Sequence, residues 1–227
     1  MLPLYIIAFV CLGMALWAAV WVFLKFHFFS LQFALVWKAL IIGVALATAY
    51  FVYGFALILV VPAFNFFMRA TPAPGRNSYY SLLSFKWYLH NGLTYLVRHT
   101  FLEFITPTPF NLFFFRLMGM KIGPNSQLNS AHISDPGLIS IGKNVTIGGS
   151  AVIIAHYGVG GVLVVAPVFI GDGATIGLRA IIMGGVTIGA GAKVLSNSVI
   201  LPKTVIPAGE TWAGVPAVKV EKKPDKT

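Results

Sequence analysis

Two histidines in the C-terminal half of this 227-residue chain could take part in proton transfer. His156 ends the stretch IGKNVTIGGSAVIIAH and opens a glycine-rich segment without charge. Imidazole titrates near neutral pH and therefore suits a general base, although a histidine in an arbitrary apolar stretch more often only caps a loop. His132 precedes Asp135 in HISDPG, a sequence that also suits a turn. The remaining histidines and the single cysteine all precede residue 100: Cys11, His27, His90 and His99.

Both histidines lie in or beside a six-residue repeat. A small or β-branched residue stands two places before each repeated apolar position. A period of six fits neither an isolated helix nor an alternating strand. It predicts a parallel β-helix, in which each hexapeptide forms one side of a triangular prism and the apolar anchor stacks on that of the next coil. The anchors are Ile170, Ile176, Ile182, Ile188, Val194, Ile200, Ile206 and Trp212.

The repeat is interrupted twice. The six-residue step starts at Ile122, loses phase in HISDPGLIS and resumes at Ile141. From Ile153 to Ile170 there are seventeen residues, which is too many for one regular side of the prism. We therefore expect residues 156–168 to leave the prism as an extruded loop that could cover an apolar substrate.

The repeat and the ending VIPAGETWAGVPAVKV resemble the hexapeptide-repeat acyltransferases, in particular their acetyltransferase branch, over residues 119–220. The resemblance implies a left-handed β-helix, a homotrimer with its site between two subunits, acetyl-CoA as donor and no metal. In that branch a histidine fourteen to sixteen residues after the IG of an IGxNVxI coil is the general base for an acceptor hydroxyl or amine. His156 stands fourteen residues after Gly142. Relatives often have aspartate after this histidine; here Tyr157 follows, so a neighbouring acid cannot be assumed to orient the ring.

The same resemblance implies roles for further residues. Acceptor-binding residues would be Asn129, His132 and Asp135, for which turn chemistry is the alternative. Backbone N–H groups after the loop would hold the thioester and pantetheine arm, and lysines would hold the coenzyme A phosphates. Turn glycines and a solvated basic face explain these residues equally well. The implied cofactor-binding residues are Gly184, Gly185, Gly191, Lys203 and Lys219.

Three alternatives stay open. The donor could carry a longer acyl chain on coenzyme A or acyl carrier protein. The domain could be a non-catalytic trimeric scaffold for other membrane enzymes. A class of carbonic anhydrases shares the repeat, but that chemistry needs three histidine ligands on zinc, and the repeat region supplies only His132 and His156.

The composition places part of the chain in lipid. It is 58% hydrophobic and 10% charged, with a mean hydropathy of +0.85, and the apolar excess precedes residue 70. The net charge of +10 suits an anionic membrane surface or a phosphorylated cofactor. Nucleic acid is a poor fit, because no basic stripe interleaved with aromatic residues is present.

Two uncharged segments, residues 2–24 and 39–61, are long enough to span a bilayer. We expect residues 26–37 to form a short interfacial link and Pro62 to end the second span. Arg69, Arg76, Lys86 and Arg98 follow the pair, so the positive-inside bias places the C-terminal domain in the cytoplasm.

The predicted organisation has four parts. Residues 1–70 form two transmembrane helices, 71–120 an interfacial helical connector, 121–220 the left-handed β-helix and 221–227 a charged tail. Within the connector, residues 78–105 are expected to be helical after the breaker stretch TPAPGRN. The sequence thus indicates an integral membrane acyltransferase whose acceptor is confined to the bilayer, such as a lipid-linked sugar or a lipid headgroup.

Overall fold

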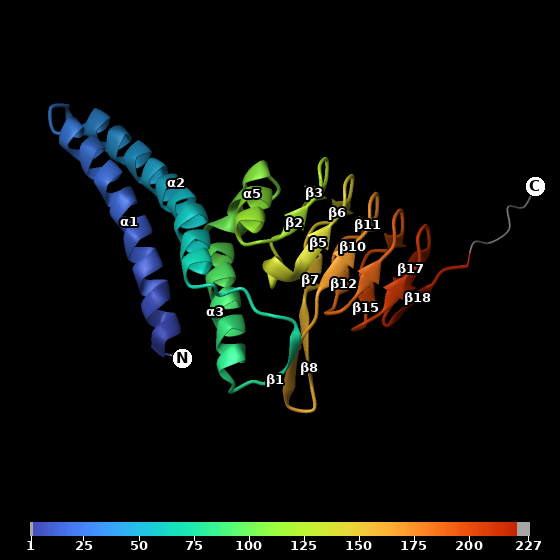
Figure 1. Cartoon of the computed structure of the whole chain (residues 1–227). Coiled ribbons are helices and arrows are strands. Elements are labelled where there is room, and N and C mark those ends of the chain that lie inside the picture. Colours follow the sequence, from blue (N-terminus) through green and yellow to red (C-terminus); the bar gives the residue numbers. More distant parts are fainter. Residues whose placement is uncertain (1, 222–227) are drawn as a thin grey trace, which may run out of the picture.

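The computed structural model describes residues 2–221, so all but the first residue of the predicted tail lies outside the described residues. A hairpin of two long helices occupies one end and a triangular β-helix the other (Figure 1). Between them stands a shorter helix that contacts both. This order positions the candidate site, because groups from the helical half reach the first coils of the β-helix.

The hairpin consists of α1 (Leu2–Ser30) and α2 (Leu35–Phe67), and both are long and apolar enough to cross a membrane. The helices are longer than predicted, so the link shrinks to residues 31–34. The prediction that Pro62 ends the second helix is wrong, since α2 continues to Phe67. Proline removes one helical hydrogen bond, but Pro62 and its neighbour Val61 are buried, and their packing offsets this loss.

The connector is helical from residue 82, close to the prediction, and it also contains a short strand that the sequence did not indicate. Ser81 caps the main helix by accepting a hydrogen bond from the Ser84 N–H at 3.1 Å. The predicted place of this helix in the lipid headgroups stays a prediction. The elements are β1 (Gly75–Ser78), α3 (Leu82–Val97), the π-helical η1 (Arg98–Leu102), α4 (Glu103–Ile105) and α5 (Pro109–Leu117).

Three sheets with parallel coil-to-coil pairing form the sides of the prism. Sheet I contains β2 (Lys121–Ile122), β5 (Ile139–Ile141), β10 (Val168–Ile170), β13 (Thr187–Ile188) and β16 (Val205–Ile206). Sheet II contains β3 (Gln127–Leu128), β6 (Thr146–Ile147), β11 (Thr175–Ile176), β14 (Lys193–Val194), β17 (Thr211–Gly214) and the antiparallel β18 (Ala217–Lys219). Sheet III contains β4 (Ile133–Ser134), β7 (Val152–Ile154), β12 (Ile181–Ile182) and β15 (Val199–Ile200).

The register confirms the anchors predicted from the repeat. In sheet I, Ile141 pairs with Ile170, Ile170 with Ile188 and Ile188 with Ile206. These four side chains are at most 5% exposed. Each coil therefore adds one buried β-branched side chain to this column, and the burial of such columns is the main stabilising contribution to the prism.

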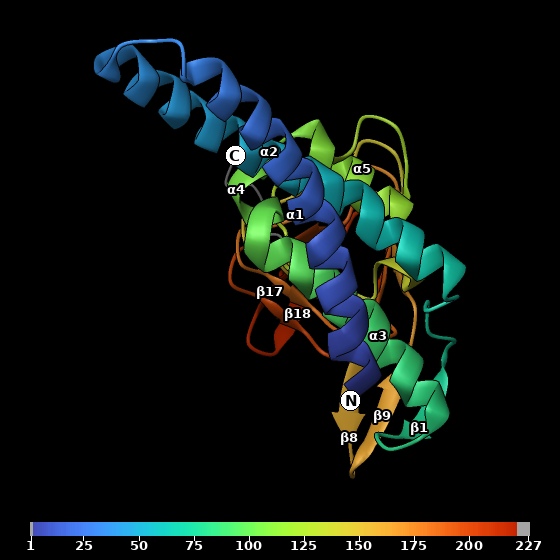
Figure 2. The ribbon, with the colours of Figure 1, turned by 90° about the vertical axis from the view of Figure 1, so that its left-hand side faces the viewer.

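The predicted extruded segment leaves the prism as a β-hairpin, but its last residue, Val168, belongs to sheet I, where it pairs with Ile139. Its strands β8 (His156–Val159) and β9 (Val162–Val165) pair antiparallel and leave the prism between sheets III and I. Strand β1 adds to β9 with Arg76 opposite Val164, which ties the connector to the hairpin. Figure 2 shows the three strands side by side near the start of α3.

Candidate active site

His156 is the first residue of β8, at the corner where the chain leaves β7. Its side chain is 19% exposed. Gly184 lies on the next coil, and a Cβ there would be 2.8 Å from the His156 backbone nitrogen. Glycine at this position therefore lets the two coils pack closely and leaves room for the backbone of His156.

A buried carboxylate holds the imidazole. Oδ2 of Asp135 lies 2.5 Å from Nδ1 of His156, and the aspartate side chain is fully buried. Asp135 adopts a left-handed conformation (φ 58°) between β4 and the 3-10 turn η2 (Pro136–Leu138), one coil before the histidine. An ionised carboxylate only accepts hydrogen bonds, so Nδ1 of His156 donates and Nε2 keeps the free lone pair. The carboxylate has no exposed atom for the acceptor contact that the resemblance implies.

Helix α3 provides the partner of this carboxylate. Nδ2 of Asn91 donates to Oδ1 of Asp135 at 2.5 Å, and the Asp135 backbone N–H donates to Oδ1 of Asn91 at 3.0 Å. Since a backbone N–H can only donate, this pairing fixes which end of the amide faces the carboxylate. One turn earlier, the Trp87 ring packs edge-on against the His156 ring with centroids 4.8 Å apart.

A second buried histidine connects α3 to the hairpin. Nδ1 of His90 lies 2.7 Å from Oδ1 of Asn65 on α2, and both side chains are buried. Burial lowers the pKa of His90 to about 4, although the charge of Asp135 acts in the opposite direction. A line of buried polar residues thus runs from α2 through α3 to the His156 corner.

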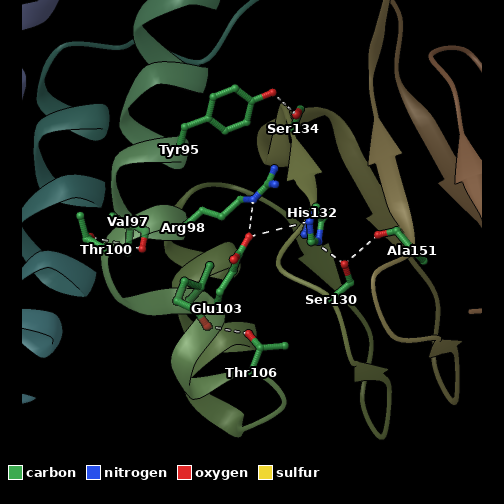
Figure 3. Close-up of polar contacts among 11 residues, drawn as sticks. Tyr95, Val97, Arg98, Thr100, Glu103, Thr106, Ser130, His132, Ser134 and Ala151 are labelled. Atoms are coloured by element: carbon green, nitrogen blue, oxygen red, sulfur yellow. Dashed lines mark hydrogen bonds and ion pairs between the residues drawn. The ribbon is translucent and has the colours of Figure 1, made fainter. Parts of the chain in front are cut away.

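Asn129 and His132 lie in a different polar cluster, which Figure 3 shows in part. Both line a cavity of about 250 Å³ that includes Glu103 and does not include His156. Nε of Arg98 donates to Oε1 of Glu103 at 2.9 Å, and this bond lowers the pKa of the glutamate. Nε2 of His132 is 3.8 Å from the same oxygen; burial, then the Arg98 charge, lowers the pKa of this histidine. Within residues 2–221, no three His, Cys, Asp or Glu side chains are gathered to hold a metal.

The residues predicted to hold the cofactor are divided between different parts of the prism. Gly185 donates its N–H to the Ala166 carbonyl and Lys203 donates its N–H to that of Gly184, so this column continues the His156 corner. Gly191 instead lies at the corner between sheets I and II, where its N–H donates to the Asp172 carbonyl of the previous coil. Nζ of Lys219, in the last strand, donates to Oε1 of Glu210 at 2.5 Å. One chain therefore brings together His156, Gly184, Gly185 and Lys203 but not Gly191 or Lys219.

The repeats match two family profiles. "Bacterial transferase hexapeptide (six repeats)" matches residues 167–202, and "Hexapeptide repeat of succinyl-transferase" matches residues 138–162. The repeats in the C-terminal half of the chain thus match those of hexapeptide transferases. The matched residues of this hexapeptide-repeat domain include His156 and Gly184.

Two curated proteins are similar in sequence. One is a delta-poly-L-ornithine synthetase of Acinetobacter baumannii, 26% identical over 185 residues, covering 77% of this chain and 13% of that protein. The other is a UDP-3-O-acylglucosamine N-acyltransferase of a Caulobacter strain, 35% identical over 108 residues, covering 44% of this chain and 30% of that protein. The chain thus spans less than a third of the length of either relative. The first similarity is too long for the β-helix alone, so it extends into the helical half.

Solved structures of acetyltransferases are also similar. A hexapeptide-repeat acetyltransferase of Vibrio cholerae, complexed with acetyl coenzyme A, is 19% identical over 70% of this chain and 98% of that chain, with a TM-score of 0.49. A maltose O-acetyltransferase of Clostridium difficile is 20% identical over 67% of this chain and 94% of that chain, also with a TM-score of 0.49.

Proposed function

We propose that this protein is a membrane-anchored acyltransferase that moves an acetyl group from acetyl-CoA to an acceptor confined to the bilayer. The observation that carries the proposal is the buried Asp135–His156 pair, which leaves Nε2 of an oriented imidazole as the free basic atom. The match to the transferase hexapeptide repeat supports acyl transfer, and the Caulobacter relative is named an N-acyltransferase.

The reaction proceeds by direct attack. Nε2 of His156 takes the proton from the acceptor hydroxyl or amine while that oxygen or nitrogen bonds to the thioester carbonyl carbon. The tetrahedral intermediate then expels the coenzyme A sulfur by breaking the C–S bond, and the imidazolium returns its proton to the thiolate. Asp135 stabilises the imidazolium through Nδ1 without taking the proton itself. No covalent enzyme intermediate is needed.

Asn91 acts as a positioning residue in this scheme. Full burial of a carboxylate is costly unless its oxygens accept hydrogen bonds, and Asp135 has one from His156 and one from Asn91. The reciprocal bond from the Asp135 backbone holds the turn that carries the carboxylate. We therefore infer that helix α3, outside the repeat domain, fixes the geometry of the proposed base.

The residues that lie next to His156 on the following coils support a binding site for acetyl-CoA at this corner. Gly184, Gly185 and Lys203 continue the corner that His156 begins, so two residues without side chains and one cation lie along a single edge. The N–H groups of Gly185 and Lys203 already donate within the prism, so we assign the contact with acetyl-CoA at this edge to the Lys203 side chain. Gly191 and Lys219 lie elsewhere in the chain, and a role for them requires a distant part of the coenzyme or a neighbouring subunit. We retain the homotrimer as part of the proposal on family grounds.

The surface of the hairpin supports the membrane anchor. Large apolar side chains stand exposed along both helices, including Phe9 at 76%, Trp17 at 74% and Leu35 at 81%. Removing each such side chain from water is favourable by about 1.5–3 kcal/mol, which favours a lipid environment. The cations after α2 favour the cytoplasmic side for the β-helix.

The test is transfer of radiolabelled acetyl groups from acetyl-CoA into a total lipid extract, comparing the native protein with His156→Ala. We expect a labelled lipid whose rate of formation falls by about 10² or more in the variant. Transfer only to soluble sugars or drugs, with lipids ignored, would contradict the membrane acceptor. The relative's name favours one second candidate, a longer acyl donor, which competition between donors of different chain length would reveal.

A further inference from the structure

A cavity of about 730 Å³ opens where α2 ends, between that helix, α3 and the end of α5. Two basic side chains and two aromatic rings meet there with a few small polar groups. No described acidic residue lines it. The residues that matter for its chemistry are Asn65, Phe66, Phe67, Arg69, Thr71 and Lys86.

The two cations of this cavity have no protein counterion among residues 2–221. Arg69 and Lys86 are both exposed, and neither takes part in an ion pair or side-chain hydrogen bond within the described chain. Arg69 has a left-handed backbone (φ 47°), set by the turn that ends α2, where its N–H donates to the Phe66 carbonyl. A guanidinium and an ammonium therefore line the same cavity, and this pair of cations suits a phosphate.

The aromatic rings specify what carries that phosphate. Phe66 and Phe67 are 75% and 80% exposed in the last turn of α2, at the end of a 33-residue apolar helix. A free anion would engage the cations and leave these rings in water. An amphiphile with a phosphate at the bilayer boundary would contact both, so the chemistry favours a phosphate-bearing lipid.

A smaller cavity continues from this one toward the proposed base. It has a volume of about 170 Å³, shares Thr71 and Lys86 with the first, and reaches Val165 of β9. Val165 is the register partner of His156. Opposed residues of an antiparallel pair project to the same face, so this cavity lies on the face to which the imidazole projects.

We propose that Arg69 and Lys86 bind the phosphate of the lipid acceptor, with the acceptor's reactive group directed along α3 toward His156. This inference rests on the proposed function and names the substrate class of that same site: a phospholipid or a lipid-linked phosphate.

Binding can be measured without any acyl donor. The full chain in detergent micelles would be titrated with phosphatidic acid and followed by native mass spectrometry, which counts bound lipids. The test variant is Arg69→Gln/Lys86→Gln, and the matched control Lys121→Gln/Lys193→Gln removes two exposed charges from the β-helix. We expect the test variant to bind phosphatidic acid at least about tenfold more weakly and the control to bind like the native protein.

Equal affinity in the test variant and the native protein would overturn the inference. Displacement of phosphatidic acid by inorganic phosphate at comparable concentration would also overturn it, since the site would then recognise free phosphate and not a lipid. Weak binding of phosphatidylcholine, in which the choline offsets the phosphate charge, would support it.

The two proposals fail in different ways. If phosphatidic acid binding needs the two cations but no donor gives acyl transfer, the lipid site stands and the proposed function falls. If transfer needs His156 but lipid binding ignores the two cations, the proposed function stands and this inference falls. If both hold, Arg69→Gln/Lys86→Gln should raise KM for a phosphorylated lipid acceptor with kcat preserved.

Discussion

The β-helix and the helical half are held together in different ways. In the β-helix, each stabilising contact repeats every coil, as in the column Ile133, Ile153, Ile182 and Ile200 of sheet III. In the helical half, single polar contacts join segments distant in sequence, such as Asn65 with His90 and Asn91 with Asp135. Repetition stabilises the prism, whereas the single contacts position the proposed base, so we expect mutations in the two regions to separate stability from activity.

The largest expected effect is on the prism. Ile153→Ala removes a fully buried anchor from the middle of sheet III and should lower the free energy of unfolding by about 2–5 kcal/mol. Thermal unfolding followed by far-UV circular dichroism measures this. Val205→Ala is the control, because Val205 is 64% exposed, and it should change the stability by less than about 0.5 kcal/mol. Equal loss in both variants would show that the anchor columns do not carry the stability.

A single contact in the helical half should affect catalysis more than stability. Asn91→Leu keeps the side-chain size but leaves a carboxylate oxygen and an N–H of Asp135 without their partner. We expect kcat to fall by about 10–10² with little change in KM for acetyl-CoA. Tyr95→Phe breaks another contact between α3 and the β-helix, to Ser134 Oγ, and should leave kcat nearly unchanged. An equal fall in kcat for both variants would mean that α3 acts only as a structural support.

The smallest expected effect is a pH dependence of stability. His90 has a folded pKa of about 4 against an ordinary 6.5, so as the pH falls through this range the unfolded chain binds a proton that the folded protein does not. The free energy of unfolding is therefore highest above pH 6.5. At pH 5 this histidine alone should lower it by about 2 kcal/mol.

His90→Gln tests that dependence. The amide can still bond to Asn65 but does not titrate, so the unfolding midpoint of the variant should change less between pH 7 and pH 5 than that of the native protein. Identical pH profiles would contradict a neutral buried His90.

The contrast between repeating and single contacts also explains which features the sequence could predict. The anchors, the extruded segment that begins at His156 and the two long helices follow from local patterns, and the structure confirms each of them. The partner of His156 did not follow, because Asp135 approaches it from the previous coil, 21 residues away, instead of from the neighbouring position. Asn91 is 44 residues from Asp135, and the only signal was an amide in an apolar helical stretch. Pairings between such distant segments leave no period in the sequence.

The most direct test of the central claim is a double-mutant cycle on the proposed base and its carboxylate. The measurement is kcat/KM for acetyl transfer in the native protein, His156→Ala, Asp135→Asn and the double variant. The account predicts a loss of about 10²–10⁴ for His156→Ala, a smaller loss for Asp135→Asn, and a double variant no slower than His156→Ala alone, because Asp135 acts through the imidazole. Losses that multiply in the double variant, or full activity in His156→Ala, would contradict it.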